Sequence, residues 1–162
     1  MTTAPNSTPG LTPEPEVFWF LDCRCRVRLA AGSNADGLSM LEFRLPHGSA
    51  PPFHVHHDED EVFQVLEGRL RLQVASAVRE LGPGEVLLAP RGTPHGFRVI
   101  SPEGARMTTL TRGGGFERMV RTVARPARDG LPPPGGVPPE TAERLEAACR
   151  AERITLLGPP IA

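Results

Sequence analysis

The chain has 162 residues, a formal net charge of −1 at pH 7, and neither lysine nor tyrosine. This length suits a single domain with its own core, and a near-neutral chain without a basic block lacks the charge pattern of nucleic-acid and anionic-membrane binders. Schiff-base catalysis by lysine and acid–base catalysis by tyrosine are excluded, so we expect small-molecule ligands.

The first fifteen residues are rich in proline, threonine and serine, which predicts a disordered arm over residues 1–15. This segment has neither the positive start nor the apolar stretch of a secretory signal. No run elsewhere in the sequence is long and apolar enough for a membrane span. We therefore expect a cytoplasmic protein.

The segment EVFWFLDC predicts the first strand and is the most hydrophobic opening in the sequence. Trp19 and Phe20 could form the contact of a homodimer there, and burial inside the same chain is the alternative. Cys23 and Cys25 follow at a spacing of two, which on a strand places both thiols on one face and disfavours a disulfide between them. With Cys149 they make an odd count, which indicates buried thiols in a reducing compartment; a redox or soft-metal pair is the functional alternative.

Short segments with alternating apolar residues continue to about residue 112, separated by turns rich in glycine and proline. In one of them Leu70, Leu72 and Val74 alternate with polar residues, so one face of the strand is buried and the other is exposed. This pattern predicts an all-β sandwich or barrel of two antiparallel sheets over residues 16–112. The segments are CRVRLA, LSMLEFRL, EVFQVL, RLRLQVA, AVREL, EVLLAP, HGFRVI and RMTTLT.

After residue 112 the apolar period changes to that of a helix, and residues 113–162 are expected to form a helical extension. The first helix should end before Pro126, and the second, ETAERLEAACRAE, follows the linker DGLPPPGGVPP. RITLLGPP predicts a last strand. The expected apolar positions are Phe116, Met119, Val120 and Val123 in the first helix, and Ala142, Leu145, Ala148 and Cys149 in the second.

The stretch PPFHVHHDEDEVFQVLEG contains three of the five histidines of the chain. On an extended strand His54 and His56 point to one face, where they can share a metal ion, and His57 points to the other. We expect His57 and the turn residue His47 at the surface. The acids at positions 58–60 are expected to form a solvated loop.

Glu61 opens the next strand on the same face as Phe63 and Val65, where an unpaired carboxylate would be costly. Coordination of a metal would remove this cost. His95, which follows a glycine–proline turn in PRGTPHGFRV, is the histidine that could join from a different strand. Three imidazoles and one carboxylate suit iron, manganese, cobalt, nickel, copper or zinc, and do not suit calcium or magnesium.

These histidines lie within two motifs of fixed spacing. The first is Gly48, five residues, His54-x-His56, four residues, Glu61, six residues and Gly68, and the second is Gly84, five residues, Pro90-x-Gly92, two residues and His95. As a pair they resemble the two motifs of the cupin superfamily. Val99 stands where the second motif usually has asparagine, at a position that is not a metal ligand in the family. GGGFERMV and the linker after it are similar to small single-domain bacterial cupins of the quercetin 2,3-dioxygenase-like group.

The resemblance implies a cupin jelly-roll barrel, a double-stranded β-helix, that holds one divalent transition metal ion through His54, His56, Glu61 and His95. It also implies a metal-dependent dioxygenase that opens the ring of a flavonol-like or other enolisable molecule. Glu61 would then be both a ligand and the base that takes the proton of the substrate hydroxyl.

Five large apolar side chains are candidate walls of a substrate pocket, although ordinary core packing would also explain them. The expected partners are a small-molecule substrate, dioxygen and a second copy of the chain, with no nucleic acid and no membrane. The candidate wall residues are Met40, Phe43, Phe63, Phe97 and Met107.

The main alternative is a metal-binding cupin without oxygen chemistry, such as an isomerase or a small-ligand sensor. A sugar-phosphate isomerase would need a basic patch inside the barrel, but Arg44, Arg71, Arg98 and Arg106 alternate with apolar residues and are expected to face solvent. A transcriptional sensor would need a helix-turn-helix segment, which the sequence lacks. A structural protein with a vestigial site is a third interpretation, which the complete ligand set disfavours.

Overall fold

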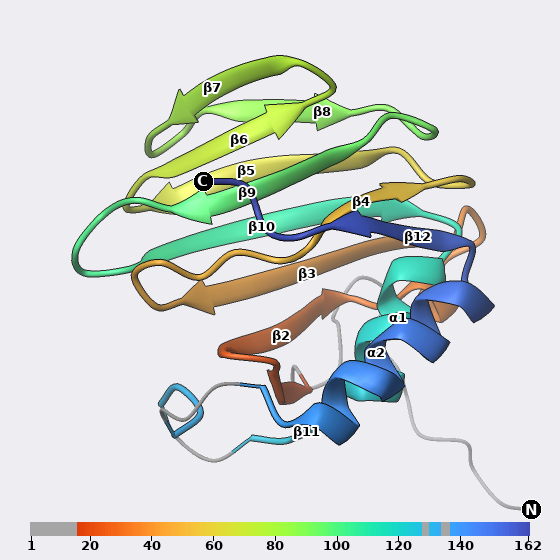
Figure 1. Cartoon of the computed structure of the whole chain (residues 1–162). Helices are drawn as coiled ribbons and strands as arrows, with labels where there is room; N and C mark the ends of the chain where they lie inside the picture. The colour runs from red at the N-terminus through yellow and green to blue at the C-terminus, as the bar shows by residue number, and fades with distance from the viewer. Residues whose placement is uncertain (1–15, 128–129, 134–136) are drawn as a thin grey trace, which may run out of the picture.

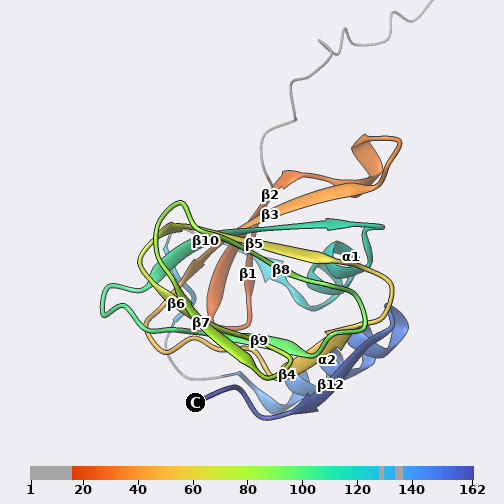
Figure 2. The same ribbon diagram turned by 90° about the horizontal axis from the view of Figure 1, so that it is seen from above.

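Two antiparallel sheets face each other around a common interior, as Figures 1 and 2 show from the side and from above. The computed structural model describes residues 16–127, 130–133 and 137–162, so the arm expected over residues 1–15 lies outside the described part. The two antiparallel sheets predicted from the alternating pattern and the jelly-roll barrel implied by the resemblance are both confirmed. Every pair of neighbouring strands described in the two sheets is antiparallel.

Strands from distant parts of the chain lie side by side in both sheets. The larger sheet has the strand order β11-β1-β2-β3-β10-β5-β8, with bounds Arg125–Pro126, Val17–Phe20, Cys23–Leu29, Leu38–Leu45, Ala105–Arg112, Glu61–Glu67 and Val86–Ala89. The smaller sheet has the order β12-β4-β9-β6-β7, with bounds Ile154–Gly158, Phe53–His56, His95–Val99, Leu70–Val74 and Ala77–Leu81.

The core lies between the two sheets because alternate side chains of each strand point inward. On β3 and β10, Phe43 and Met107 are paired in register and both are almost fully buried. The three cysteines are buried free thiols, as predicted. Phe20 is also buried in this core, and the indole Nε1 of Trp19 donates a hydrogen bond of 3.1 Å to the carbonyl of Gly130. Both aromatic residues therefore make contacts within the chain, and the homodimer stays a prediction.

Gly68 shows why a motif position must be glycine. It lies in the turn between β5 and β6 with φ of +76°, a conformation that other residues rarely adopt. A Cβ atom there would collide with the carbonyl oxygen of Gly104. The tight turn brings β6 directly into the opposite sheet.

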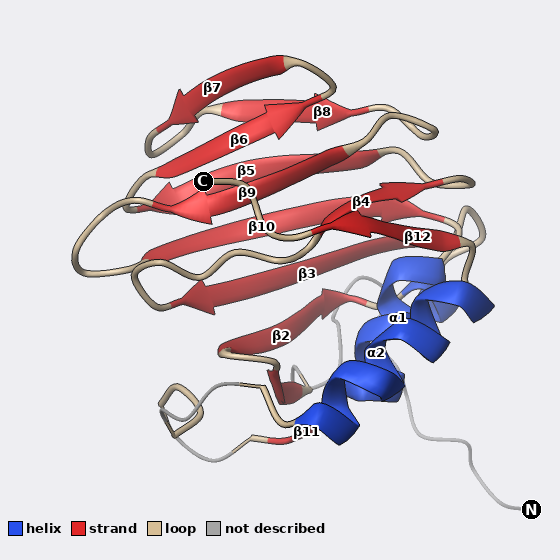
Figure 3. Cartoon of the chain, in the orientation of Figure 1, coloured by secondary structure: helices blue, strands red, loops and turns tan. Residues whose placement is uncertain are grey.

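Two helices cover one corner of the barrel, coloured blue in Figure 3. They are α1 (Gly115–Val123) and α2 (Pro139–Ala151), and a short 3-10 turn, η1, spans Ala31–Ser33. Both predicted helices are confirmed, and the four apolar positions expected in α1 are buried. In α2, Ala142 is exposed, which corrects the predicted apolar face, because this residue lies in the first turn before the helix reaches its neighbours. Neither described helix is long and apolar enough to cross a membrane.

Candidate metal centre

Three strands bring the four predicted ligand residues together from the two sheets. His54 on β4 lies directly opposite His95, the first residue of β9, and His56 follows two positions along β4. Glu61 is the first residue of β5 in the facing sheet. Strand alternation points all four side chains into the barrel, so the cluster lies between the two sheets at one end of the strands.

The cluster is compact and largely closed to solvent. One candidate ligand atom from each residue can be chosen so that all four lie within 4.8 Å of one another. The relative exposure is 2% for His56, 2% for Glu61 and 1% for His95, and His54 is partly buried. The centroids of the His54 and His95 rings are 4.5 Å apart. Four polar groups this close and this buried require a common partner or a network of protons.

Backbone carbonyls set the orientation of two of the three imidazoles. Nδ1 of His54 lies 2.7 Å from the carbonyl oxygen of Pro52, and Nδ1 of His95 lies 2.8 Å from that of Thr93. A carbonyl can only accept, so each Nδ1 carries a hydrogen. On a neutral ring this leaves the lone pair of Nε2 directed into the barrel, whereas a proton on Nε2 of His95 forms the hydrogen bond to Glu61. This is the tautomer in which a histidine ligates a metal through Nε2.

Burial and neighbouring charges shift the pKa values of the cluster residues in different directions. Burial and the neighbouring rings of His95 and His56 lower the pKa of His54 to about 4. Burial alone would raise the pKa of Glu61, but the hydrogen bond from His95 and the nearby imidazoles hold it below its ordinary value. Burial works against a proton on His95, yet the Glu61 carboxylate raises the pKa of this ring. The cluster therefore favours an ionised Glu61 and a neutral His54.

The residues fit a bound transition ion. Oε2 of Glu61 lies 3.1 Å from Nε2 of His95 and 3.5 Å from Nε2 of His56, and neither ring nitrogen of His56 has a hydrogen-bond partner among the described residues. An unpartnered imidazole in the interior is costly, and a cation that accepts its lone pair would remove the cost. Three nitrogen donors and one oxygen donor are the set expected for a transition ion.

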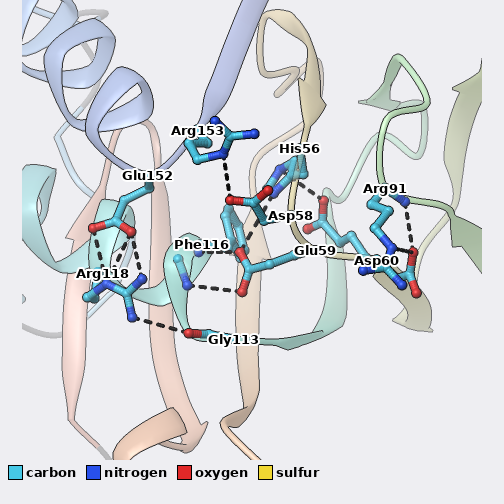
Figure 4. A network of polar contacts seen from close by, with 12 residues as sticks. His56, Asp58, Glu59, Asp60, Arg91, Gly113, Phe116, Arg118, Glu152 and Arg153 are labelled. Carbon is cyan, nitrogen blue, oxygen red and sulfur yellow. Dashed lines mark hydrogen bonds and ion pairs between the residues drawn. The ribbon is translucent and has the colours of Figure 1, made fainter.

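Glu59 is a buried residue of this region that the sequence interpretation placed wrongly in a solvated loop. Its relative exposure is 5%, because Oε1 accepts a hydrogen bond from the backbone N–H of Gly115 at 3.0 Å and Oε2 accepts one from Phe116 at 2.7 Å. Figure 4 shows this carboxylate at the start of α1, beside His56, whose Nδ1 is 4.0 Å away. Glu59 thus caps the helix and supports one wall of the cluster.

The other residues of the acidic loop behave as predicted. Asp58 and Asp60 are exposed. Asp58 forms an ion pair of 2.7 Å with Arg153, and Asp60 accepts a hydrogen bond of 2.8 Å from the backbone N–H of Arg91. Figure 4 shows both contacts. His57 is exposed and lies 2.9 Å from the hydroxyl of Thr155. His47 is also exposed, which leaves both histidines outside the cluster.

A cavity with largely apolar walls opens beside the cluster. It contains about 730 Å³ of atom-free space, including its open mouth, and His54, His56 and Glu61 form part of its lining. Met40 does not line it, because position 40 has the opposite parity to Phe43 on β3 and its side chain points away from the interior. The four other candidate wall residues, Phe43, Phe63, Phe97 and Met107, do line the cavity, and their contact with a substrate stays a prediction.

The family profile described as a cupin domain matches residues 41–111, a segment that runs from β3 to β10 and includes the four clustered side chains. Residues 41–111 form a cupin domain. The predicted resemblance is confirmed, and α1, α2 and β12 are additions after the matched cupin segment.

Curated proteins and solved structures similar to this cupin include enzymes of different reactions. Quercetin 2,3-dioxygenase of Bacillus subtilis is 30% identical over 110 residues, which cover 68% of this chain and 32% of the relative. Dimethylsulfoniopropionate lyase DddQ of Ruegeria pomeroyi is 31% identical over 78 residues, which cover 48% of this chain and 38% of the relative. The structure of oxalate decarboxylase from Bacillus subtilis at pH 4.6 superposes with a TM-score of 0.55 at 19% identity, covering 69% of this chain and 32% of that one, and this likeness shows the fold alone. The chain spans about a third of the length of these curated relatives.

Proposed function

We propose that this cupin is a metal-dependent dioxygenase that acts on a flavonol-like or other enolisable small molecule. The observation that carries the proposal is that the partly buried His54 and the buried His56 and Glu61 line the same cavity as a set of phenylalanine side chains. His54, His56, Glu61 and His95 would hold one transition ion, which would supply Lewis acidity and redox chemistry towards dioxygen. A flat aromatic substrate would be held by the surrounding phenylalanine rings.

Glu61 is the proposed base. The neighbouring imidazoles keep its pKa below the ordinary value, so its carboxylate is ionised at neutral pH and can accept the hydroxyl proton of an enol. Its side chain is 2% exposed, so bulk water does not compete for this proton transfer. The same carboxylate faces His56 and His95, which would stabilise its charge before the substrate arrives.

The similarity to quercetin 2,3-dioxygenase supports this proposal. The matched part covers 68% of this chain at 30% identity. Since only 32% of that relative is covered, substrate and reaction are part of the proposal for this chain.

A metal-dependent lyase without oxygen chemistry is the second candidate, and the similarity to DddQ favours it. In that case Glu61 would remove a proton from a carbon or oxygen of the substrate, and no dioxygen would be consumed. A sugar-phosphate isomerase is less well supported, because no arginine is among the described residues that line the cavity. Arg71 and Arg106 instead form outward ion pairs of 3.0 Å with Glu80 and 2.6 Å with Glu67.

Oxygen consumption separates these candidates. The full chain would be loaded with iron, nickel or manganese, its metal content measured by elemental mass spectrometry, and an oxygen electrode used with a panel of flavonols. We expect close to one ion per chain and flavonol-dependent oxygen uptake that is absent from the metal-free protein. A Glu61→Gln variant that retains its metal should lose the uptake. A loaded protein that consumes no oxygen with any flavonol would exclude the dioxygenase.

A further inference from the structure

A second polar site lies in the cavity, away from the clustered histidines. Asp22 is half-buried in the two-residue turn between β1 and β2, and its Oδ1 accepts a hydrogen bond of 3.0 Å from the hydroxyl of Ser49. Ser49 is 5% exposed, and both residues line the cavity that contains His54, His56 and Glu61. Among the described residues Asp22 forms no ion pair and has Ser49 as its side-chain donor, so hydrogen-bonding capacity of its carboxylate remains free.

The turn that carries Asp22 is strained. Leu21 has φ of +53°, in the left-handed region that residues other than glycine, asparagine and aspartate rarely occupy. The Leu21 side chain packs against the core and lines the same cavity. Strain of this kind persists where the surrounding structure imposes it and concentrates at functional sites. Here it directs Leu21 and Asp22 together to the cavity wall.

The length of β9 indicates how far apart the two polar parts of the cavity wall lie, the Asp22–Ser49 pair and the histidine cluster. His95 begins β9 and Val99 ends it, and Val99 exchanges backbone hydrogen bonds with the Gly48–Ser49 segment, of 3.1 Å and 2.9 Å. Four residue steps along a strand correspond to about 13 Å. The backbone of Ser49, paired with Val99, therefore lies about 13 Å from the backbone of His95 along β9.

Apolar side chains separate these two ends. The lining between and around them includes Phe43, Leu45, Phe97 and Met107. The other polar side chain in the wall is Thr109, whose hydroxyl is buried without a hydrogen-bond partner among the described residues. The lining thus suits an elongated, mostly apolar ligand that carries polar atoms at its two ends.

We propose that Asp22 and Ser49 determine substrate specificity by accepting a hydrogen bond from a hydroxyl group at the far end of an aromatic substrate whose near end reaches the cluster of His54, His56, Glu61 and His95. The inference rests on the proposed function for the near end only. A neutral phenolic hydroxyl suits this place because it donates to the free carboxylate and fits between apolar walls. A ligand that lacks the hydroxyl covers the carboxylate without pairing its free lone pairs, and therefore binds more weakly.

Binding to the zinc-loaded full chain tests the inference without relying on turnover, because zinc has no redox chemistry. The probes are 3-hydroxyflavone, which offers oxygen atoms to the cluster alone, and its 4′-hydroxy and 7-hydroxy derivatives, which add a hydroxyl at either end. We expect one derivative to bind about 10- to 100-fold more tightly than 3-hydroxyflavone. In Asp22→Asn this preference should fall to within about threefold of unity, while the affinity for 3-hydroxyflavone stays close to that of the wild type.

Two controls keep the result specific. Asp36→Asn removes the same charge from an exposed loop residue paired with Arg112, and should leave the preference intact. Ser49→Ala should weaken the preference less than Asp22→Asn, because the carboxylate remains. Thermal unfolding of each variant checks that the barrel is folded.

Three outcomes would overturn the inference: no preference in the wild type, equal weakening of all probes by Asp22→Asn, or no binding of any probe. Oxygen uptake is measured separately, so the two proposals fail independently. A hydroxyl preference that depends on Asp22 in a protein that consumes no oxygen would support this inference and reject the dioxygenase. Oxygen uptake without the preference would do the reverse.

Discussion

Glu59 and Glu61 are two positions apart in the sequence and almost equally buried, yet their surroundings differ. Both oxygens of Glu59 accept backbone N–H groups at the start of α1. Oε2 of Glu61 faces the ring nitrogens of His56 and His95, and His56 has no hydrogen-bond partner of its own among the described residues. The first carboxylate is satisfied by the fold, whereas the second belongs to a group of donors that the fold leaves incomplete.

This difference separates stability from function. A buried carboxylate with two backbone partners stabilises the structure, and its removal leaves two N–H groups unpaired. A buried set of imidazoles without hydrogen-bond partners is costly, and a bound cation would remove this cost. Substitutions at the helix cap should therefore change unfolding, and substitutions in the cluster should change ligand content.

The largest expected effect is the loss of metal on removing both imidazoles of β4. In His54→Ala, His56→Ala double variants the affinity for zinc should fall by more than ~100-fold, because two of four ligands are gone. Elemental mass spectrometry after dialysis measures the retained metal. His57→Ala, which changes an exposed neighbour, should keep close to one ion per chain. A double variant that still retained its metal would place the binding site elsewhere.

Removal of the Glu59 carboxylate should lower stability with little effect on metal content. We expect Glu59→Gln to lose about 2–3 kcal/mol of unfolding free energy, because a glutamine amide replaces one of two charged acceptors at the helix start with a donor. Urea unfolding of the metal-free chain measures the change. Asp60→Asn, an exposed neighbour, should change stability by less than about 0.5 kcal/mol. Equal effects of the two substitutions would contradict the structural role of Glu59.

Glu117 extends the comparison to a third buried carboxylate and adds a pH dependence. Burial would raise its pKa, but the backbone N–H of Ala31 and the side chains of Arg121 and Ser39 hold it below the ordinary value of 4.5. Because the pKa is lower in the folded state, the ionised group stabilises the fold above pH 4.5, and this contribution is lost as the pH falls through the folded pKa. Glu117→Gln should cost about 1–2 kcal/mol at pH 7. Urea unfolding between pH 7 and pH 3 should show the unfolding free energies of the wild type and of Glu117→Gln converging as the pH falls. A difference in free energy that stays constant with pH would contradict the stabilising role of the ionised Glu117.

The smallest expected effect concerns two buried hydroxyl groups on β10. Thr109 and Thr111 both lack a hydrogen-bond partner among the described residues, but Thr109 lines the cavity and Thr111 does not. Replacing either by valine should leave stability unchanged or raise it by up to about 1 kcal/mol. Because 3-hydroxyflavone offers its oxygen atoms to the cluster alone, neither substitution should change its binding to the zinc-loaded chain by more than about twofold. A large loss of stability in Thr109→Val would mean that this hydroxyl is already satisfied.

The sequence was sufficient for the parts of the site that follow strand alternation. Phe63 and Val65 define the buried face of β5 and place Glu61 on it, and the spacing of His54 and His56 places both on one face of β4. The same rule excludes Met40, which has the wrong parity for the interior of β3. Strand alternation therefore predicts which face of the sheet a side chain lies on, but it does not predict which residues that side chain contacts.

Glu59 could not be placed in this way, because its partners Gly115 and Phe116 are 56 and 57 positions further along the chain. One local signal was available. Helix α1 begins after Gly114, which has no side chain to cap the first N–H groups, so a buried cap had to come from elsewhere. The Asp22–Ser49 pair left no such signal, since it depends on how the β1–β2 turn meets the segment before β4.

The pairing of β12 with β4 has a consequence for biosynthesis. Ile154 lies opposite His56 and Leu156 opposite His54, so the strand that flanks both histidines leaves the ribosome about a hundred residues after them. Until then β4 is an unprotected edge of its sheet, able to pair with other chains. A chain cut short before Ile154 would therefore expose its histidine strand to aggregation.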